Sequence, residues 1–143
     1  MLEAAAEDDG LAAVVSEGAG TRTLAEELVE YDTSSIVRGF HALVAKHLGL
    51  MLFSNEPAPE SLVKLVPRIA PRQVLLIWAP NGGNRETMNP LYQRLIGNSA
   101  DIWAIDDAKH IKGLQTHPEE YERRVVRFFD HALLGAQSAA GSD

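Results

Sequence analysis

A single histidine, His110, follows the apolar run DIWAI, which is predicted to be a strand. Histidine is the side chain that most often moves protons near neutral pH. A carboxylate beside the ring fixes its tautomer and stabilises the imidazolium that forms when it takes a proton. His110 is therefore our first candidate for a general base, and it needs an acid to orient it.

Four carboxylates are candidates for that acid. Asp106 and Asp107 are nearest to His110 in the sequence, but we expect them to end the strand and shape the turn. Glu86 is the only acid in the loop APNGGNRE, which follows an earlier predicted strand, and Glu17 follows the first one. The carboxyl ends of parallel strands share one edge of a sheet, so either glutamate could reach His110. Glu86 could instead stabilise the N-terminus of the next helix.

The sequence offers no nucleophile beside His110. It contains no cysteine and no G-x-S-x-G motif. Ser16 lies in VVSEG and lacks the glycine two positions earlier that permits a sharp elbow, so we interpret it as a loop serine. His110 and one acid thus form two thirds of a nucleophilic triad.

Other residues suggest different functions. Gly82 and Gly83 precede a predicted helix and could hold an anion at its N-terminus, which would make the protein a non-enzymatic binding module. His41 and His47 are six residues apart and do not share a helix face, so they are not predicted to bind a metal. No cofactor is predicted.

The strands and helices that must position these residues alternate along the sequence. Short apolar runs at 11–15, 74–78 and 101–105 predict buried strands. The segments expected to be helical are 1–9, 24–31, 36–53, 61–66, a segment from 86 or 88 to 96, and 117–134. Capping boxes at Thr23–Glu26 and Thr116–Glu119 mark two of the helix starts. The alternation predicts an α/β fold with a partial, three-stranded parallel sheet flanked by helices.

The length and net charge of the chain limit its number of domains and its possible binding partners. The chain has 143 residues, enough for one domain over 1–135 with a frayed tail at 136–143. Its net charge of -7 disfavours a nucleic-acid surface. It contains neither a long uncharged apolar run nor a signal peptide, so we expect a cytoplasmic protein without a membrane span. Three strands leave a bare sheet edge, which predicts self-association or further sequence upstream.

Three segments resemble the C-terminal half of α/β-hydrolases of the dienelactone-hydrolase and acyl-esterase type. They are RIAPRQVLLIWAPNGGNRETMNPLY, DIWAIDDAKHIKGL and HPEEYERRVVRFFDHAL, and the match runs from about Leu11 to Leu134. The resemblance implies that His110 is the catalytic histidine and that Glu86 is the catalytic acid. It implies a small acyl substrate, namely an ester, thioester or lactone. It also implies a lid-like helical insert over 21–66.

Two departures from the family pattern qualify what the resemblance implies. The family nucleophile lies in a G-x-S-x-G elbow, whereas the first residues, MLEAAAEDDGLAAVV, resemble the body of the helix that follows the elbow. We therefore expect the serine and its oxyanion hole upstream of Met1, and we expect the present chain to be an inactive fragment. The acid loop APNGGNRE is also longer than the usual G-x-x-D.

Overall fold

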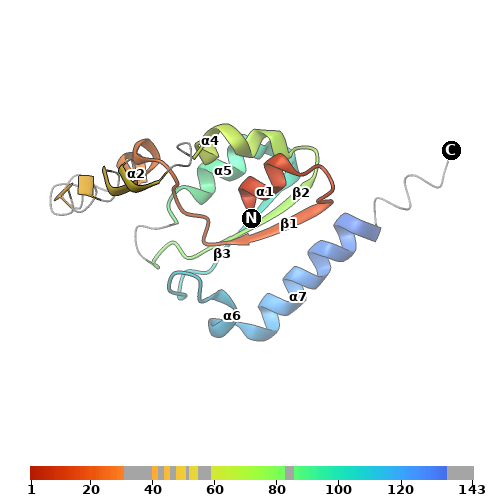
Figure 1. Ribbon diagram of the computed structural model, residues 1–143. Helices are drawn as coiled ribbons and strands as arrows, with labels where there is room; N and C mark the ends of the chain where they lie inside the picture. Colours follow the sequence, from red (N-terminus) through yellow and green to blue (C-terminus); the bar gives the residue numbers. More distant parts are fainter. Residues whose placement is uncertain are drawn as a thin grey trace.

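A three-stranded parallel sheet forms the centre of the protein (Figure 1). The computed structural model describes residues 1–30, 40–41, 44–45, 48–50, 52–54, 59–82 and 86–134. The strands are β1 (Ala13–Glu17), β2 (Gln73–Trp78) and β3 (Ala100–Ala104), and β2 lies between the other two. The register aligns Val14 with Val74 and Val74 with Ala100. The predicted three-stranded parallel sheet with flanking helices is thus confirmed.

Helices cover both faces of the sheet (Figure 1). One face carries α1 (Leu2–Glu7), α4 (Leu62–Leu65) with the 3₁₀ turn η1 (Val66–Ile69), and α5 (Asn89–Ile96), which ends in a second 3₁₀ turn, η2 (Gly97–Ser99). The other face carries α6 (Gly113–Thr116) and α7 (Pro118–Phe129), followed by the π-helical turn η3 (Asp130–Leu134). A further α-helix, α2, spans Leu24–Glu30. Within the described ranges, no helix is long and apolar enough to cross a membrane.

Alternating side chains of the central strand divide the core into two clusters. Val74 and Leu76 of β2 point to one face, where they pack with Val14 and Tyr92. Leu75 and Ile77 point to the other face, where Trp103 and Ile105 join them. The apolar residues of α7, Tyr121, Val125 and Phe128, are only partly buried against this second cluster. A strand that is covered on both faces consists of consecutive apolar residues, which is why β2 could be predicted from the sequence.

The first strand begins two residues later than predicted. Residues 11–15 were expected to form it and Ser16 and Glu17 to lie in a loop, but both residues belong to β1. Their backbones pair with Leu76 and Ile77 of β2, and the Ser16 side chain is buried. The parallel ladder therefore overrides the local polarity of the segment SEG, which had suggested a loop.

Two predicted helix features near prolines are also wrong. Thr116 does not cap the long C-terminal helix, because it ends α6 and its hydroxyl donates to the carbonyl of Lys112. The long helix instead begins at Pro118, which needs no hydrogen-bond acceptor for its nitrogen. Pro67 was expected to end the helix at 61–66, but the chain continues through it as the 3₁₀ turn η1.

The buried carboxylate of Glu26 joins the two ends of the predicted insert at 21–66. The capping box forms, since Glu26 N–H donates to the Thr23 hydroxyl at 3.3 Å and Thr23 N–H donates to Glu26 Oε2 at 3.0 Å. Glu26 Oε1 accepts from the Ser61 hydroxyl at 2.7 Å and from Val63 N–H at 3.0 Å. One side chain thus holds the starts of α2 and α4 together. Most of the segment between them, and the tail at 136–143, lie outside the described residues.

Replacing Glu26 by glutamine is expected to destabilise the fold by about 1–3 kcal/mol at pH 7. Burial by itself raises the pKa of Glu26, but hydrogen bonds from Arg22, Ser61, Val63 and Thr23 outweigh it and lower the pKa below its ordinary value of 4.5. A lowered folded-state pKa adds stability above the unfolded pKa, and this stability is lost as the pH falls through the folded value. The difference in the free energy of unfolding between wild type and E26Q, measured in urea from pH 7 to 3, should therefore become smaller as the pH falls.

Glu60→Gln is the matched control, because Glu60 is an exposed glutamate that pairs with Arg68 at the surface. It should change the free energy of unfolding by less than about 1 kcal/mol. Equal stability of E26Q and wild type at pH 7 would contradict the role assigned to Glu26.

Candidate active site

Glu86 lies in the loop after β2, and its carboxylate is almost completely buried, with 1% of the residue exposed. The chain turns directly after the strand, where Gly82 N–H donates to the carbonyl of Ala79. The carboxylate folds back on the same turn, and its Oε2 accepts from Ala79 N–H at 2.6 Å. Glu86 precedes α5 and is not part of its first turn, since that helix begins at Asn89.

His110 lies in the loop after β3, and its ring meets the buried carboxylate. His110 Nδ1 is 2.6 Å from Glu86 Oε1, and the N–H of Ile111 donates to the same oxygen at 3.2 Å. The side chain of His110 remains 30% exposed, whereas that of Glu86 is 1% exposed. The structure thus brings together the two residues predicted as the catalytic histidine and its acid.

This arrangement can perform general acid–base chemistry. A carboxylate accepts the Nδ1 hydrogen, which places the free lone pair of a neutral ring on Nε2. When Nε2 takes a proton, the adjacent carboxylate stabilises the resulting imidazolium. In the part of the chain that the structure describes, no hydroxyl group hydrogen-bonds the ring of His110. The pair therefore lacks a nucleophile among the described residues.

Close backbone contacts hold the histidine loop in place. A Cβ added to Gly82 would lie 2.7 Å from the backbone nitrogen of His110. Ile111 adopts a φ of 50°, a left-handed conformation that is costly for a β-branched residue. A Cβ on Gly18, at the end of β1, would lie 2.6 Å from Ile111 Cγ2 and 3.0 Å from Glu86 Oε1. The loop after β3 therefore passes over the end of β2 and reaches the end of β1.

Glu17, the alternative acid, does not reach His110. Its Oε1 accepts from Gly113 N–H at 2.7 Å, and its Oε2 accepts from the hydroxyl of Tyr121 at 3.1 Å. Glu17 thus fixes the loop three residues beyond His110 and ties it to α7. Sequence reasoning missed this role, although an acid at a strand end and a tyrosine on an amphipathic helix face were both visible.

Asp106 and Asp107 stay away from the ring of His110. The carbonyl of Asp106 accepts from the Asn81 side chain at 3.0 Å, which links the loops after β2 and β3. Asp107 pairs with His117, whose Nε2 is 2.8 Å from Asp107 Oδ1. The hydrogen bond from His117 lowers the pKa of Asp107. This second pair of histidine and acid is exposed and provides an internal control for the buried one.

Gly82, one of the two glycines proposed to bind an anion, packs against the histidine loop. The space beside Gly82 is filled by the backbone of residues 109 and 110 and by Ala79, and α5 starts seven residues later. This contact supports a packing role for Gly82, while Gly83 lies outside the described residues. Ser16 is buried within β1, 7% exposed, and does not form part of an elbow.

We compared the chain with models of protein families, with curated proteins and with solved structures, and none of the three comparisons found a match. The candidate site therefore rests on the residues and their geometry.

Replacing Gly82 by alanine is expected to displace the His110 loop and to cost about 1–3 kcal/mol of stability, because the added methyl group overlaps backbone atoms. The measurement is thermal unfolding together with NMR of the His110 ring, whose resonances should shift. Gly49→Ala is the control, since no atom of the described residues would lie within 4 Å of a Cβ at Gly49. Ring resonances that are identical in G82A and wild type would contradict the close approach.

The pKa of Tyr121 offers a second measurement. Burial, the nearby charge of Glu17 and its hydrogen bond raise this pKa to about 12. Glu17→Gln should lower the pKa of Tyr121 towards its ordinary value of 10, as followed by NMR of the Tyr121 ring during an alkaline titration. Because the raised pKa stabilises the fold below the unfolded value, wild type should lose stability as the pH rises from about 10 to 12. An unchanged pKa in E17Q would be inconsistent with the contact.

Proposed function

We propose that this chain is the C-terminal half of a serine hydrolase with an α/β-hydrolase fold. The reaction is acyl transfer to water from an ester, a thioester or a lactone. His110 is the general base, and Glu86 is the acid that orients it. The observation that carries the proposal is the contact of 2.6 Å between His110 Nδ1 and a carboxylate that is 1% exposed.

The burial of Glu86 supports a catalytic pair over an ordinary surface contact. A buried charge is costly unless it is fully hydrogen-bonded, and a pair of this kind is seldom built for stability alone. Glu86 accepts from Ala79 N–H, from Ile111 N–H and from His110. The exposed pair of His117 and Asp107 shows that the chain also forms such contacts without burial. A buried acid that orients a partly exposed histidine is the arrangement that nucleophilic triads use.

The position of the histidine loop indicates where a nucleophile would have to come from. The loop lies against Gly18, so it reaches the end of β1, the outer strand on that side of the described sheet. A further parallel strand beside β1 would end about 5 Å away. Ala13 to Ser16 carry no charge that would oppose such pairing. We therefore propose that a polypeptide segment at this edge supplies the serine and the oxyanion hole.

On this proposal the 143-residue chain alone does not turn over p-nitrophenyl acetate, because no hydroxyl group of the described residues hydrogen-bonds His110. The polypeptide read in the same frame from the DNA upstream of Met1 is expected to contain G-x-S-x-G and to be active. In that longer polypeptide His110→Ala should lower kcat by about 10⁴-fold or more, and Glu86→Gln by about 10²- to 10⁴-fold.

His117→Ala is the matched control and should leave kcat unchanged, because His117 pairs with an exposed aspartate away from the site. Turnover by the 143-residue chain that is lost in H110A and blocked by a fluorophosphonate would overturn the proposed inactivity. An active longer polypeptide that is insensitive to H110A would overturn the role of His110. The absence of an in-frame G-x-S-x-G motif upstream would overturn the proposal that this chain is the C-terminal half of a serine hydrolase.

A further inference from the structure

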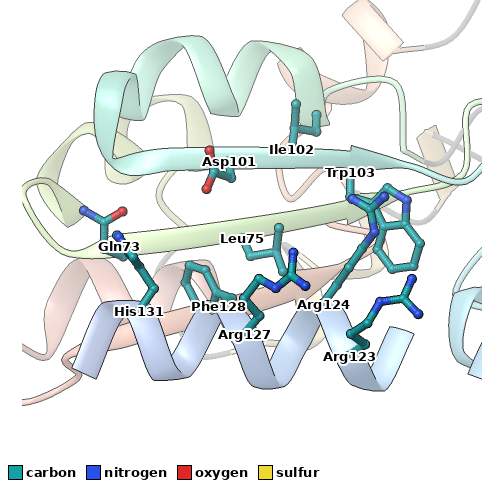
Figure 2. A pocket seen from close by; sticks show the side chains of 10 residues that line it. All are labelled: Gln73, Leu75, Asp101, Ile102, Trp103, Arg123, Arg124, Arg127, Phe128 and His131. Atoms are coloured by element: carbon teal, nitrogen blue, oxygen red, sulfur yellow. The ribbon is translucent and has the colours of Figure 1, made fainter. Parts of the chain in front are cut away.

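A groove of about 570 Å³ lies between α7 and the neighbouring strands β2 and β3 (Figure 2). Its volume falls within the range of small-molecule sites. Leu75, Trp103 and Phe128 provide an apolar surface. None of the lining residues belongs to the site of Glu86 and His110, and Gln73 and Asp101 place part of the groove at the strand starts, at the opposite end of the sheet.

Basic side chains line the α7 side of the groove. They are Arg123, Arg124, Arg127 and His131, and they face a single lining carboxylate, that of Asp101 (Figure 2). The chain as a whole has 13 lysines and arginines and 20 acidic residues. Among the residues that line the groove, three arginines outnumber one aspartate, and such a local excess of positive charge attracts anions.

The three arginines differ in the contacts that they already make with other side chains. Arg124 lies over the Trp103 ring, 4.5 Å from its centroid, and pairs with Glu120 at 2.8 Å. Arg123 approaches the same carboxylate only to 3.9 Å. Within the described part of the chain, the exposed guanidinium of Arg127 has no ion pair. Arg127 therefore remains available for a bound oxyanion, while Arg124 orders the wall beside it.

We propose that this groove binds a small organic anion. The apolar body of the ligand lies against Leu75, Trp103 and Phe128, and its carboxylate or phosphate head is held by Arg127 with Arg123 beside it. The planar guanidinium forms two parallel hydrogen bonds to either head group, which makes arginine suited to this task. Asp101 repels the head and weakens the binding. The site is independent of the hydrolase proposal, since the two share no residue.

The test uses the full 143-residue chain and NMR titration of the Trp103 indole N–H. The probes are 2-naphthoate and 2-naphthyl phosphate, which distinguish the two head groups, with acetate as the head alone and 2-naphthol as the body alone. At least one naphthyl anion should bind saturably in the micromolar to millimolar range and more tightly than acetate and 2-naphthol. Its Kd should rise with salt, because the head is held by charge.

Two variants, one that removes a positive charge and one that removes a negative charge, locate the site. Arg127→Gln should weaken binding of the naphthyl anion about tenfold, whereas Asp101→Asn should tighten it severalfold. Arg94→Gln is the matched control, because Arg94 is an exposed arginine of α5 outside the groove, and it should leave Kd unchanged. The absence of saturable binding, equal losses in R127Q and R94Q, or an unchanged Kd in D101N would each overturn the proposal.

Discussion

The cost of burying the carboxylate of Glu86 determines how the loops of the candidate site are arranged. Glu86 is nearly inaccessible to water, and its two oxygens accept three hydrogen bonds from Ala79, His110 and Ile111. Each donor must be held in place, because a buried charge that loses a partner destabilises the fold by several kcal/mol. The turn after β2, the close approach at Gly82 and the left-handed backbone of Ile111 all serve that requirement.

Two other glutamates follow the same physical principle at different places. Glu26 joins the starts of α2 and α4, and Glu17 joins the end of β1 to Gly113 and Tyr121. Glu26 satisfies backbone N–H groups at two helix starts, and Glu17 satisfies one backbone N–H and a tyrosine hydroxyl. Carboxylates thus help to position these described loops, while the apolar clusters hold the sheet and its helices.

The sequence predicted best those features whose signal is local. A continuous apolar run was enough for β2, and the pattern of Thr23 and Glu26 was enough for the start of α2. The start of β1 was wrong because pairing with β2, which is distant in the sequence, decides where the strand begins. The cap at Thr116 was wrong because a competing local structure, the short helix α6, ends there and the Thr116 hydroxyl donates to the carbonyl of Lys112. The choice of Glu86 over Glu17 as the neighbour of His110 came from a family resemblance, and composition and spacing left it open.

The partners of the two strand-end glutamates differ in how far apart they lie along the chain. The contact between Glu86 and His110 closes a loop of 24 residues, whereas the contact between Glu17 and Gly113 closes one of 96. Closing the longer loop costs about 1.2 kcal/mol more chain entropy, two doublings of length at about 0.6 kcal/mol each. The unit from β2 to the loop after β3 can therefore bring the histidine to its acid at low entropic cost. The contact with β1 closes the longer loop, so the far end of the histidine loop is fixed at a greater entropic cost.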